Sequence, residues 1–200
     1  MTDTPFVYGD DPDLPGWKRW ELRECLPQGP EPRQGDRGDQ EDGSRADRLS
    51  ERESHFVYID DAEHPGWKRW ELRDPTRFNA FLGPILTRVE DGKALVRMVP
   101  GREHSNLRDS THGGALLGFM DVALFAAARS FGVISAGGAV TLDLSAQFIG
   151  TSTIGQPIVA EVELLRETGR MLFMRGLVKQ DANVLASFSG TVRKSSPPKS

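Results

Sequence analysis

The sequence has very little cysteine, because Cys25 is the only one in 200 residues. A disulfide framework needs pairs of cysteines and a thiolate zinc site needs several, so both are excluded. We expect no bound metal and no metal cofactor, because the four histidines also lack the spacing of metal ligands. These histidines are His55, His64, His104 and His112.

No hydrophobic run is long enough to cross a bilayer. The longest one, residues 115–128, contains Asp121 and falls short of the roughly 20 residues that a spanning helix needs. The first residues lack the basic and apolar regions of a signal peptide. A formal net charge of -4 argues against a general nucleic-acid binder. We therefore expect a soluble, cytoplasmic protein that binds neither membranes nor nucleic acid.

Apolar side chains are almost absent from residues 24–55, and two similar segments flank this stretch. Such a composition cannot bury enough surface to offset the entropy of ordering, so we predict a disordered acidic linker. Residues 6–23 and 56–73 are identical at 14 of 18 positions. Each copy carries two tryptophans beside Lys-Arg, so each is either an aromatic recognition patch or an arm that packs on the main domain.

The predicted organisation is therefore a first repeat copy (1–23), the linker (24–55), a second copy as an N-terminal arm (56–76) and a globular domain (77–195). From residue 78 onward the apolar pattern becomes regular. It predicts a hairpin turning at Asp91-Gly92, one helix over about 113–130, and then an antiparallel meander. The strands of that meander are expected at 139–149, 157–167, 170–180 and 184–193.

The predicted helix is apolar on every side except at Asp121. A helix of this kind must be wrapped by protein, so the natural arrangement is a sheet curled around it. We expect the Asp121 carboxylate to be buried without a basic partner within helical reach, which costs several kcal/mol unless the group serves chemistry or finds distant donors.

The beginning of this helix reads Thr111-His112-Gly113-Gly114. Its backbone N–H groups lie at the positive end of the helix dipole, where an anion or an oxyanion binds. Asp121 follows His112 by nine residues, about 13.5 Å along a helix, and cannot reach a carbonyl held at the helix start. Either the two features are unrelated, or a two-fold dimer brings one subunit's helix start to the other subunit's acid.

Asn106, the His112-Gly113-Gly114 turn, Asp121 and the later run from Val140 to Leu144 together resemble the PaaI-like acyl-CoA thioesterases of the hotdog fold. The resemblance covers about residues 77–194. It implies an α+β hotdog fold, with an antiparallel sheet wrapped around one long helix. It also implies homodimers that pair into tetramers, and hydrolysis of acyl- or aryl-CoA thioesters without metal.

The resemblance also implies roles for individual residues. Gly113 matches the backbone donor of the oxyanion hole, and Asn106 the side chain that helps to hold the thioester or water. Asp121, from the opposite subunit, matches the general base or nucleophile, and Thr141 the hydroxyl that orients water beside it. His112 and Gly114 match the substrate-binding turn.

The coenzyme A phosphates could meet arginines near the Thr168-Gly169 turn, of which Arg170 is the candidate. Residues 76–200 carry 14 basic and 10 acidic side chains, which suits an anionic substrate but is equally explained by ordinary surface charge. No nucleophile elbow, Walker lysine or dinucleotide-binding glycine pattern occurs. The alternative function is a non-catalytic acyl-CoA-binding or scaffold protein of the same fold.

Overall fold

The computed structural model describes residues 6–10, 15, 18–22, 55–134 and 139–194. The chain divides into two compact units, 1–42 and 43–200. In the first unit, β1 (Phe6–Asp10) and β2 (Lys18–Leu22) form an antiparallel hairpin. The predicted linker lies, apart from His55, outside the described residues.

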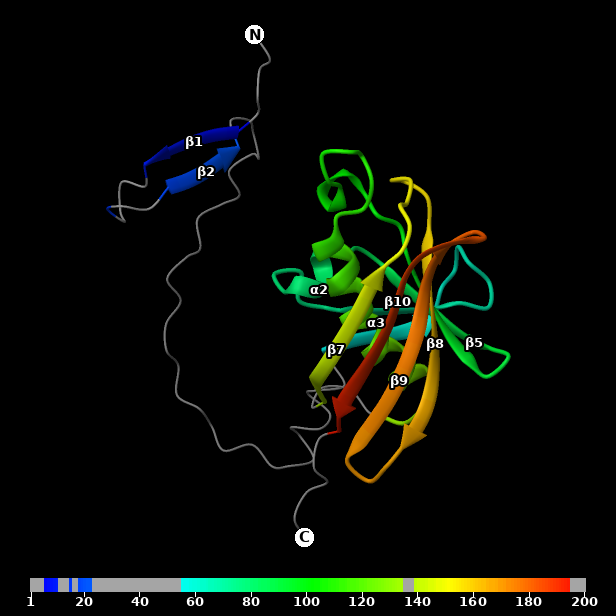
Figure 1. The fold of residues 1–200 in the computed structure, drawn as a ribbon. Coiled ribbons are helices and arrows are strands. Elements are labelled where there is room, and N and C mark those ends of the chain that lie inside the picture. Colours follow the sequence, from blue (N-terminus) through cyan, green and yellow to red (C-terminus); the bar gives the residue numbers. More distant parts are fainter. Residues whose placement is uncertain (1–5, 11–14, 16–17, 23–54, 135–138, 195–200) are drawn as a thin grey trace, which may run out of the picture. The chain divides into compact units, whose positions relative to one another are not determined.

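The second unit contains an eight-stranded antiparallel sheet and one long helix, α3 (Gly113–Ser130) (Figure 1). The sheet order is β3-β4-β5-β6-β8-β9-β10-β7. Its strands are β3 (Phe56–Asp60), β4 (Lys68–Leu72), β5 (Ile85–Glu90), β6 (Lys93–Met98), β7 (Val140–Phe148), β8 (Ile158–Glu167), β9 (Met171–Gln180) and β10 (Asn183–Arg193). A short helix, α2 (Phe78–Phe81), and a 3₁₀ turn, η1 (Arg102–His104), lie in the connections.

The predicted hotdog fold is confirmed, with the helix and the strands where the sequence pattern put them. The hairpin between β5 and β6 turns at Asp91 and Gly92, whose φ angles of 48° and 75° suit the tight turn. The expected meander is only partly right, because β7 pairs with β10 at one edge of the sheet and not with β8. The chain crosses from β7 to β8, which takes its place in the middle of the sheet beside β6.

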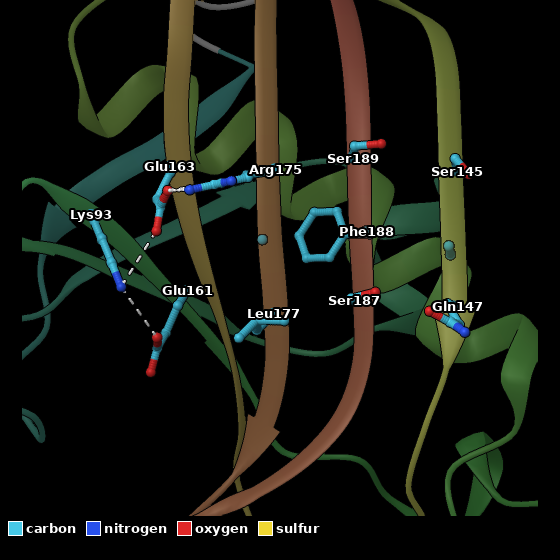
Figure 2. Close-up of a pocket in the computed structure, with 12 residues that line it drawn as sticks. Lys93, Ser145, Gln147, Glu161, Glu163, Arg175, Leu177, Ser187, Phe188 and Ser189 are labelled. Carbon is cyan, nitrogen blue, oxygen red and sulfur yellow. Dashed lines mark hydrogen bonds and ion pairs between the residues drawn. The ribbon is translucent and has the colours of Figure 1, made fainter.

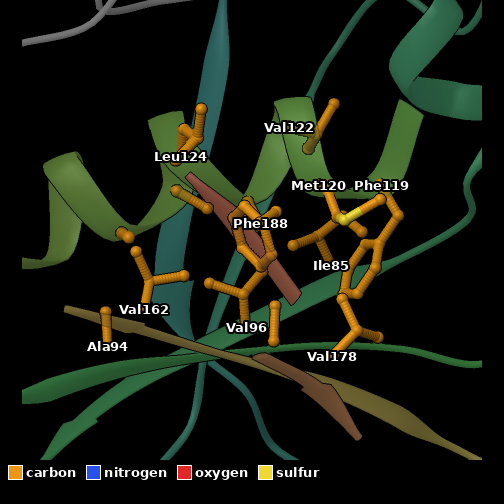
Figure 3. Packing of buried hydrophobic residues seen from close by; sticks show 14 of the residues in the cluster. Ile85, Ala94, Val96, Phe119, Met120, Val122, Leu124, Val162, Val178 and Phe188 are labelled. Atoms are coloured by element: carbon orange, nitrogen blue, oxygen red, sulfur yellow. The ribbon is translucent and has the colours of Figure 1, made fainter. Parts of the chain in front are cut away.

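The central position of β8 follows from what it buries. Ile158, Ala160 and Val162 alternate along it and are fully buried against α3. In Figure 3, Phe119, Met120 and Leu124 of the helix pack on this face of the sheet, and all three are also fully buried. Burial on this scale contributes about 1.5–3 kcal/mol for each large side chain.

Helix α3 is long and apolar enough to cross a membrane by length and composition, contrary to the expectation from the shorter run of residues 115–128. In the fold, however, 56% of its residues are buried inside the protein. Gly190 of β10 permits the close packing, because a Cβ there would lie 2.4 Å from Cδ1 of Leu124. The helix therefore behaves as the core helix of the domain.

The second repeat copy is part of the same sheet. Strand β4 pairs with β5 through Lys68 and Thr87, Arg69 and Leu86, and Trp70 and Ile85. The Trp70 side chain is buried in the hydrophobic core. The second copy is therefore an arm that packs its tryptophan on the main domain, which is one of the two interpretations of the repeat.

Candidate active site

Asp121 lies in the middle of α3 and is half-buried, with a hydrogen-bond partner from β7. Thr141 Oγ1 donates to Asp121 Oδ1 at 2.5 Å. The carboxylate has no basic partner within helical reach, as expected, and of the alternatives left open it finds a distant donor, which a strand far away in sequence supplies. Among the described residues, no hydrogen bond reaches Oδ2, so this oxygen is available to a water or substrate.

A β-bulge turns Thr141 toward the helix. Opposite β10, the register shifts so that Thr191 pairs with Asp143 and Val192 with Thr141, which leaves Leu142 as the extra residue. Val192 is fully buried, so its partner Thr141 lies on the helix side of the sheet. Bulges are frequent beside active sites because they redirect a side chain in this way.

The first turn of α3 is capped by His112. The His112 Nδ1 atom accepts a 2.9 Å hydrogen bond from the backbone N–H of Gly114. The Gly114 N–H is therefore occupied by a side chain of its own chain. Among the described residues, the Gly113 N–H has no acceptor and remains at the positive end of the helix.

The ring of Phe148, at the end of β7, lies over Gly113. A Cβ at Gly113 would be 3.5 Å from Cζ of this ring. Phe148 is nevertheless 49% exposed, so it forms an open apolar wall beside the Gly113 N–H. The Gly113 N–H at the helix start therefore lies near an exposed aromatic ring.

Asn106 organises the loop before α3. Its Oδ1 accepts hydrogen bonds from the backbone N–H groups of Arg108 at 2.8 Å and Ser110 at 3.3 Å. Its Nδ2 group has no acceptor among the described residues. The side chain therefore braces the loop with its oxygen, and its two N–H groups are the donors that this loop offers.

Contacts of Thr111, Ser152 and His104 that the sequence did not predict hold this loop in place. Thr111 N–H donates to Ser152 Oγ at 3.1 Å, and the two hydroxyls are 2.5 Å apart. His104 is buried, accepts from the Gly101 N–H at Nδ1 and donates from Nε2 to the Phe81 carbonyl. Ser152 is 41 residues from Thr111, so no local spacing could have revealed this contact.

The structure brings the predicted residues together in two groups rather than one. Asn106, His112 and Gly113 share the loop and the helix start, next to the end of β7. Asp121 and Thr141 meet near the beginning of the same strand. Gly113 and Asp121 are eight residues apart along α3, about 12 Å, so one chain does not place the acid beside the backbone donor.

Arg170 lies in the exposed turn between β8 and β9. Its backbone carbonyl accepts a 2.8 Å hydrogen bond from the Lys194 N–H. The next residue, Met171, pairs with Arg193, which in turn pairs with Val140 at the start of β7. Arg170 is therefore at the same end of the sheet as Thr141.

An apolar surface borders Asp121 on α3. Phe78 of α2 lies against Gly118, where a Cβ would be 2.5 Å from the Phe78 ring. Phe78 is 56% exposed and Leu117, one turn before Asp121, is 40% exposed. Together they offer uncovered hydrophobic area within one helical turn of the carboxylate.

A hollow of about 550 Å³ lies elsewhere, on the face of the sheet opposite α3 (Figure 2). Glu161 and Glu163 line it and alternate with the buried Val162, so they point away from the helix. Lys93 lies 3.5 Å from Glu163, and a hydrogen bond from Arg175 lowers the pKa of Glu163. None of the predicted site residues line this hollow. Within the described ranges, no three His, Cys, Asp or Glu side chains form a metal-binding group.

Comparison with known proteins relates part of this domain to a family. Residues 109–187, which include Gly113, Asp121 and Thr141, match the model of the thioesterase superfamily. The domain has the hotdog fold, and its residues 109–187 are similar to the thioesterase superfamily. No curated protein matches the chain.

Solved structures of similar fold include proteins named for phenylacetic acid degradation. The TT0310 protein from Thermus thermophilus is 27% identical with a TM-score of 0.50, over 62% of this chain and 99% of that one. A mutant of the phenylacetic acid degradation protein PaaI from the same organism is 25% identical with a TM-score of 0.50, over 60% and 99%. Thioesterase superfamily member 2 from Mus musculus, 18% identical with a TM-score of 0.50 over 58% and 86%, shares the fold.

Proposed function

We propose that this thioesterase-superfamily protein hydrolyses acyl- or aryl-CoA thioesters to the free acid and coenzyme A. The observation that carries the proposal is the Asp121–Thr141 hydrogen bond, which orients the carboxylate and leaves Oδ2 without a partner among the described residues. The superfamily match includes both residues. A protein that only binds hydrocarbon would gain nothing from a carboxylate in an otherwise apolar stretch of helix, because burying a charged group costs free energy.

The chemistry needs a base and donors for the carbonyl oxygen. Asp121 takes a proton from water as the water oxygen bonds to the thioester carbon. The Gly113 N–H and the Asn106 amide donate to the oxygen that becomes negative in the tetrahedral intermediate. The carbon–sulfur bond then breaks, and the proton on Asp121 goes to the thiolate, so the carboxylate is restored.

These groups meet only if a second subunit contributes. Among the described strands, β7 forms one edge of the sheet, with Thr141 near its start and Phe148 at its end. Its free backbone groups and the exposed side chains of Val140 and Leu142 suit pairing with another strand. Antiparallel pairing of β7 with its copy would bring the Gly113 end of one subunit to the Asp121 end of the other.

The bulge restricts the register that we propose for this pairing. A two-fold axis perpendicular to the sheet keeps each side chain on its own face, so only residues that point the same way face each other. With Leu142 counted as the bulged residue, placing Phe148 opposite the partner's Thr141 puts Ser145 opposite its own copy. We therefore place the dimer axis at Ser145.

The substrate follows from the surfaces around these groups. Phe78 and Leu117 near Asp121, and Phe148 over Gly113, would border the acyl or aryl group. Arg170 would lie at the subunit boundary, at the same end of the sheet as Thr141, and is the candidate residue for binding the coenzyme A phosphates. We expect the reaction to need no metal, and the cytoplasmic location and the pairing of dimers into tetramers remain predictions.

The deciding experiment is a turnover panel of short-, medium- and long-chain acyl-CoA and aryl-CoA thioesters, with detection of the free thiol. Asp121→Asn is the matched control, because it keeps the size and most hydrogen bonds of the side chain. We expect turnover to fall by at least about 100-fold in this variant. Binding of the thioesters without any turnover by the wild-type protein would instead support the non-catalytic acyl-CoA-binding alternative.

A further inference from the structure

The second repeat copy pairs with one edge of β5, on the side opposite β6. This side is called the β5 edge below. Three backbone pairs join it to this edge, at Lys68, Arg69 and Trp70. The Trp70 ring enters the core and stacks on Phe56 with a centroid separation of 5.4 Å. The repeat hairpin therefore docks on the β5 edge through its own contacts, in addition to being connected to the domain by the chain.

Side chains of the hairpin make further contacts with the domain. The Arg88 guanidinium of β5 lies 4.7 Å from the centre of the Trp67 ring, and Arg129 of α3 lies 5.3 Å from the centre of the Tyr58 ring. Inside the hairpin, the Asp61 carboxylate accepts hydrogen bonds from Arg69 at 2.9 and 3.1 Å. Every hairpin residue in these contacts recurs in the first copy at the position 50 residues earlier.

The backbone of the first copy is paired in the same way. Phe6 pairs with Leu22 and Asp10 with Lys18, as Phe56 pairs with Leu72 and Asp60 with Lys68. The first copy thus carries the same residues on a hairpin of the same register. We propose that the first repeat copy, residues 6–23, is a second ligand for the β5 edge and replaces the second copy there when that copy is released.

Two differences make the second copy the preferred occupant. His64, whose Nδ1 lies 2.8 Å from Asp61 Oδ1, is replaced by Leu14 in the first copy, which cannot make this contact. The second copy also reaches β5 through 12 intervening residues, and the first through 62. The longer tether lowers the effective concentration roughly tenfold. The first copy therefore occupies the edge only when the second copy is weakened.

Disulfide trapping in the full chain tests the exchange. The residue pair is Lys18→Cys with Thr87→Cys in a Cys25→Ser background, because Thr87 faces the corresponding residue, Lys68, in the docked hairpin. Facing residues of an antiparallel pair are close enough for a disulfide. Lys68→Cys with Thr87→Cys is the positive control.

We expect the Lys18→Cys/Thr87→Cys disulfide to be scarce in the otherwise unchanged chain and to increase several-fold when Trp70→Ala weakens the second copy. Adding Trp20→Ala should abolish it. The size of the product under non-reducing conditions shows whether the hairpin comes from the same chain or from another copy. The proposal is overturned if the positive control forms and Trp70→Ala gives no increase, or if Trp20→Ala leaves the increase unchanged.

A second measurement covers the case in which Trp70→Ala does not fold. The four substitutions Ile59→Gly, Ala62→Pro, Glu63→Asp and His64→Leu place the sequence of the first copy at the position of the second. We expect the full chain with these changes to fold with its melting temperature lowered by only a few degrees. A loss as large as that caused by deleting residues 56–73 would show that this sequence does not dock, and would overturn the proposal.

Discussion

Thr141 on β7 donates a hydrogen bond to Asp121 on α3, and it does so because the bulge at Leu142 turns Thr141 onto the helix side of the sheet. The bond leaves one carboxylate oxygen for chemistry. It also ties the acid to the edge strand through which we propose that two subunits meet. The orientation of the carboxylate and its proposed place at the subunit boundary therefore both depend on the start of β7.

The first prediction concerns this hydrogen bond. Thr141→Val keeps the shape of the side chain but removes the donor, so the carboxylate loses its fixed orientation. We expect kcat to fall about 10- to 150-fold, in line with the 1.5–3 kcal/mol typical of a hydrogen bond to a charged group, with little change in KM. Thr141→Ser should retain most of the activity. Equal activity of Thr141→Val and the wild type, or a loss in Thr141→Ser as large as that in Thr141→Val, would contradict this role of the hydroxyl.

The second prediction tests the shared site. Asp121→Ala and Asn106→Ala subunits are each impaired at both sites of a homodimer. In a mixed dimer, one site receives both defects and the other receives neither. Activity should therefore return on mixing, to about a quarter of the wild-type value after complete random exchange. A mixture of Asp121→Ala with Asp121→Asn is the control and should recover nothing.

Subunit exchange in the mixing experiment is verified by mass. If mixed dimers form and remain inactive, the site lies within one chain, and the two-subunit mechanism must be abandoned.

The third prediction concerns the dimer axis. In a Cys25→Ser background, Ser145→Cys should form a disulfide between two subunits under mild oxidation, because facing residues of antiparallel strands have the required separation. Asp143→Cys points to the same side but faces Gln147 of the partner subunit, so it should not crosslink. Equal crosslinking of the two variants, measured on a non-reducing gel, would rule out this register.

The fourth prediction concerns the stability of the hairpin at low pH. Hydrogen bonds from His64 and Arg69 lower the pKa of Asp61 to about 2. A carboxyl group whose pKa is lower in the folded than in the unfolded protein stabilises the fold at pH values above its pKa in the unfolded chain. This stabilisation is lost as the pH falls toward the pKa in the folded protein. Between about pH 4 and pH 2, the melting temperature should therefore drop more in the wild type than in Asp61→Asn.

Asp60→Asn is the matched control for this experiment, because the Asp60 side chain is 89% exposed and bonds only to Lys68 among the described residues. It should keep the steep wild-type dependence on pH. Parallel curves for the wild type and Asp61→Asn would mean that the charge of Asp61 does not stabilise the hairpin.

The sequence by itself determined the elements and the fold class, because these depend on local patterns. The uninterrupted apolar run around Asp121 could only be a wrapped helix, and Asp91-Gly92 could only be a tight turn. Comparison of the sequence with itself identified the repeat, and the resemblance to PaaI-like thioesterases indicated the candidate residues Asn106, Gly113 and Thr141.

Only the tertiary structure decided how these pieces meet, because the decisive contacts join residues far apart in the chain. Strict alternation along β7 would have placed Thr141 on the outer face with Asp143, and only the register against β10 reveals the bulge that turns it inward. The contact between Thr111 and Ser152 likewise depends on the crossing that carries the chain from β7 to β8. A side chain's partner across a sheet is set by register and strand order, which hydrophobic periodicity along one strand does not encode.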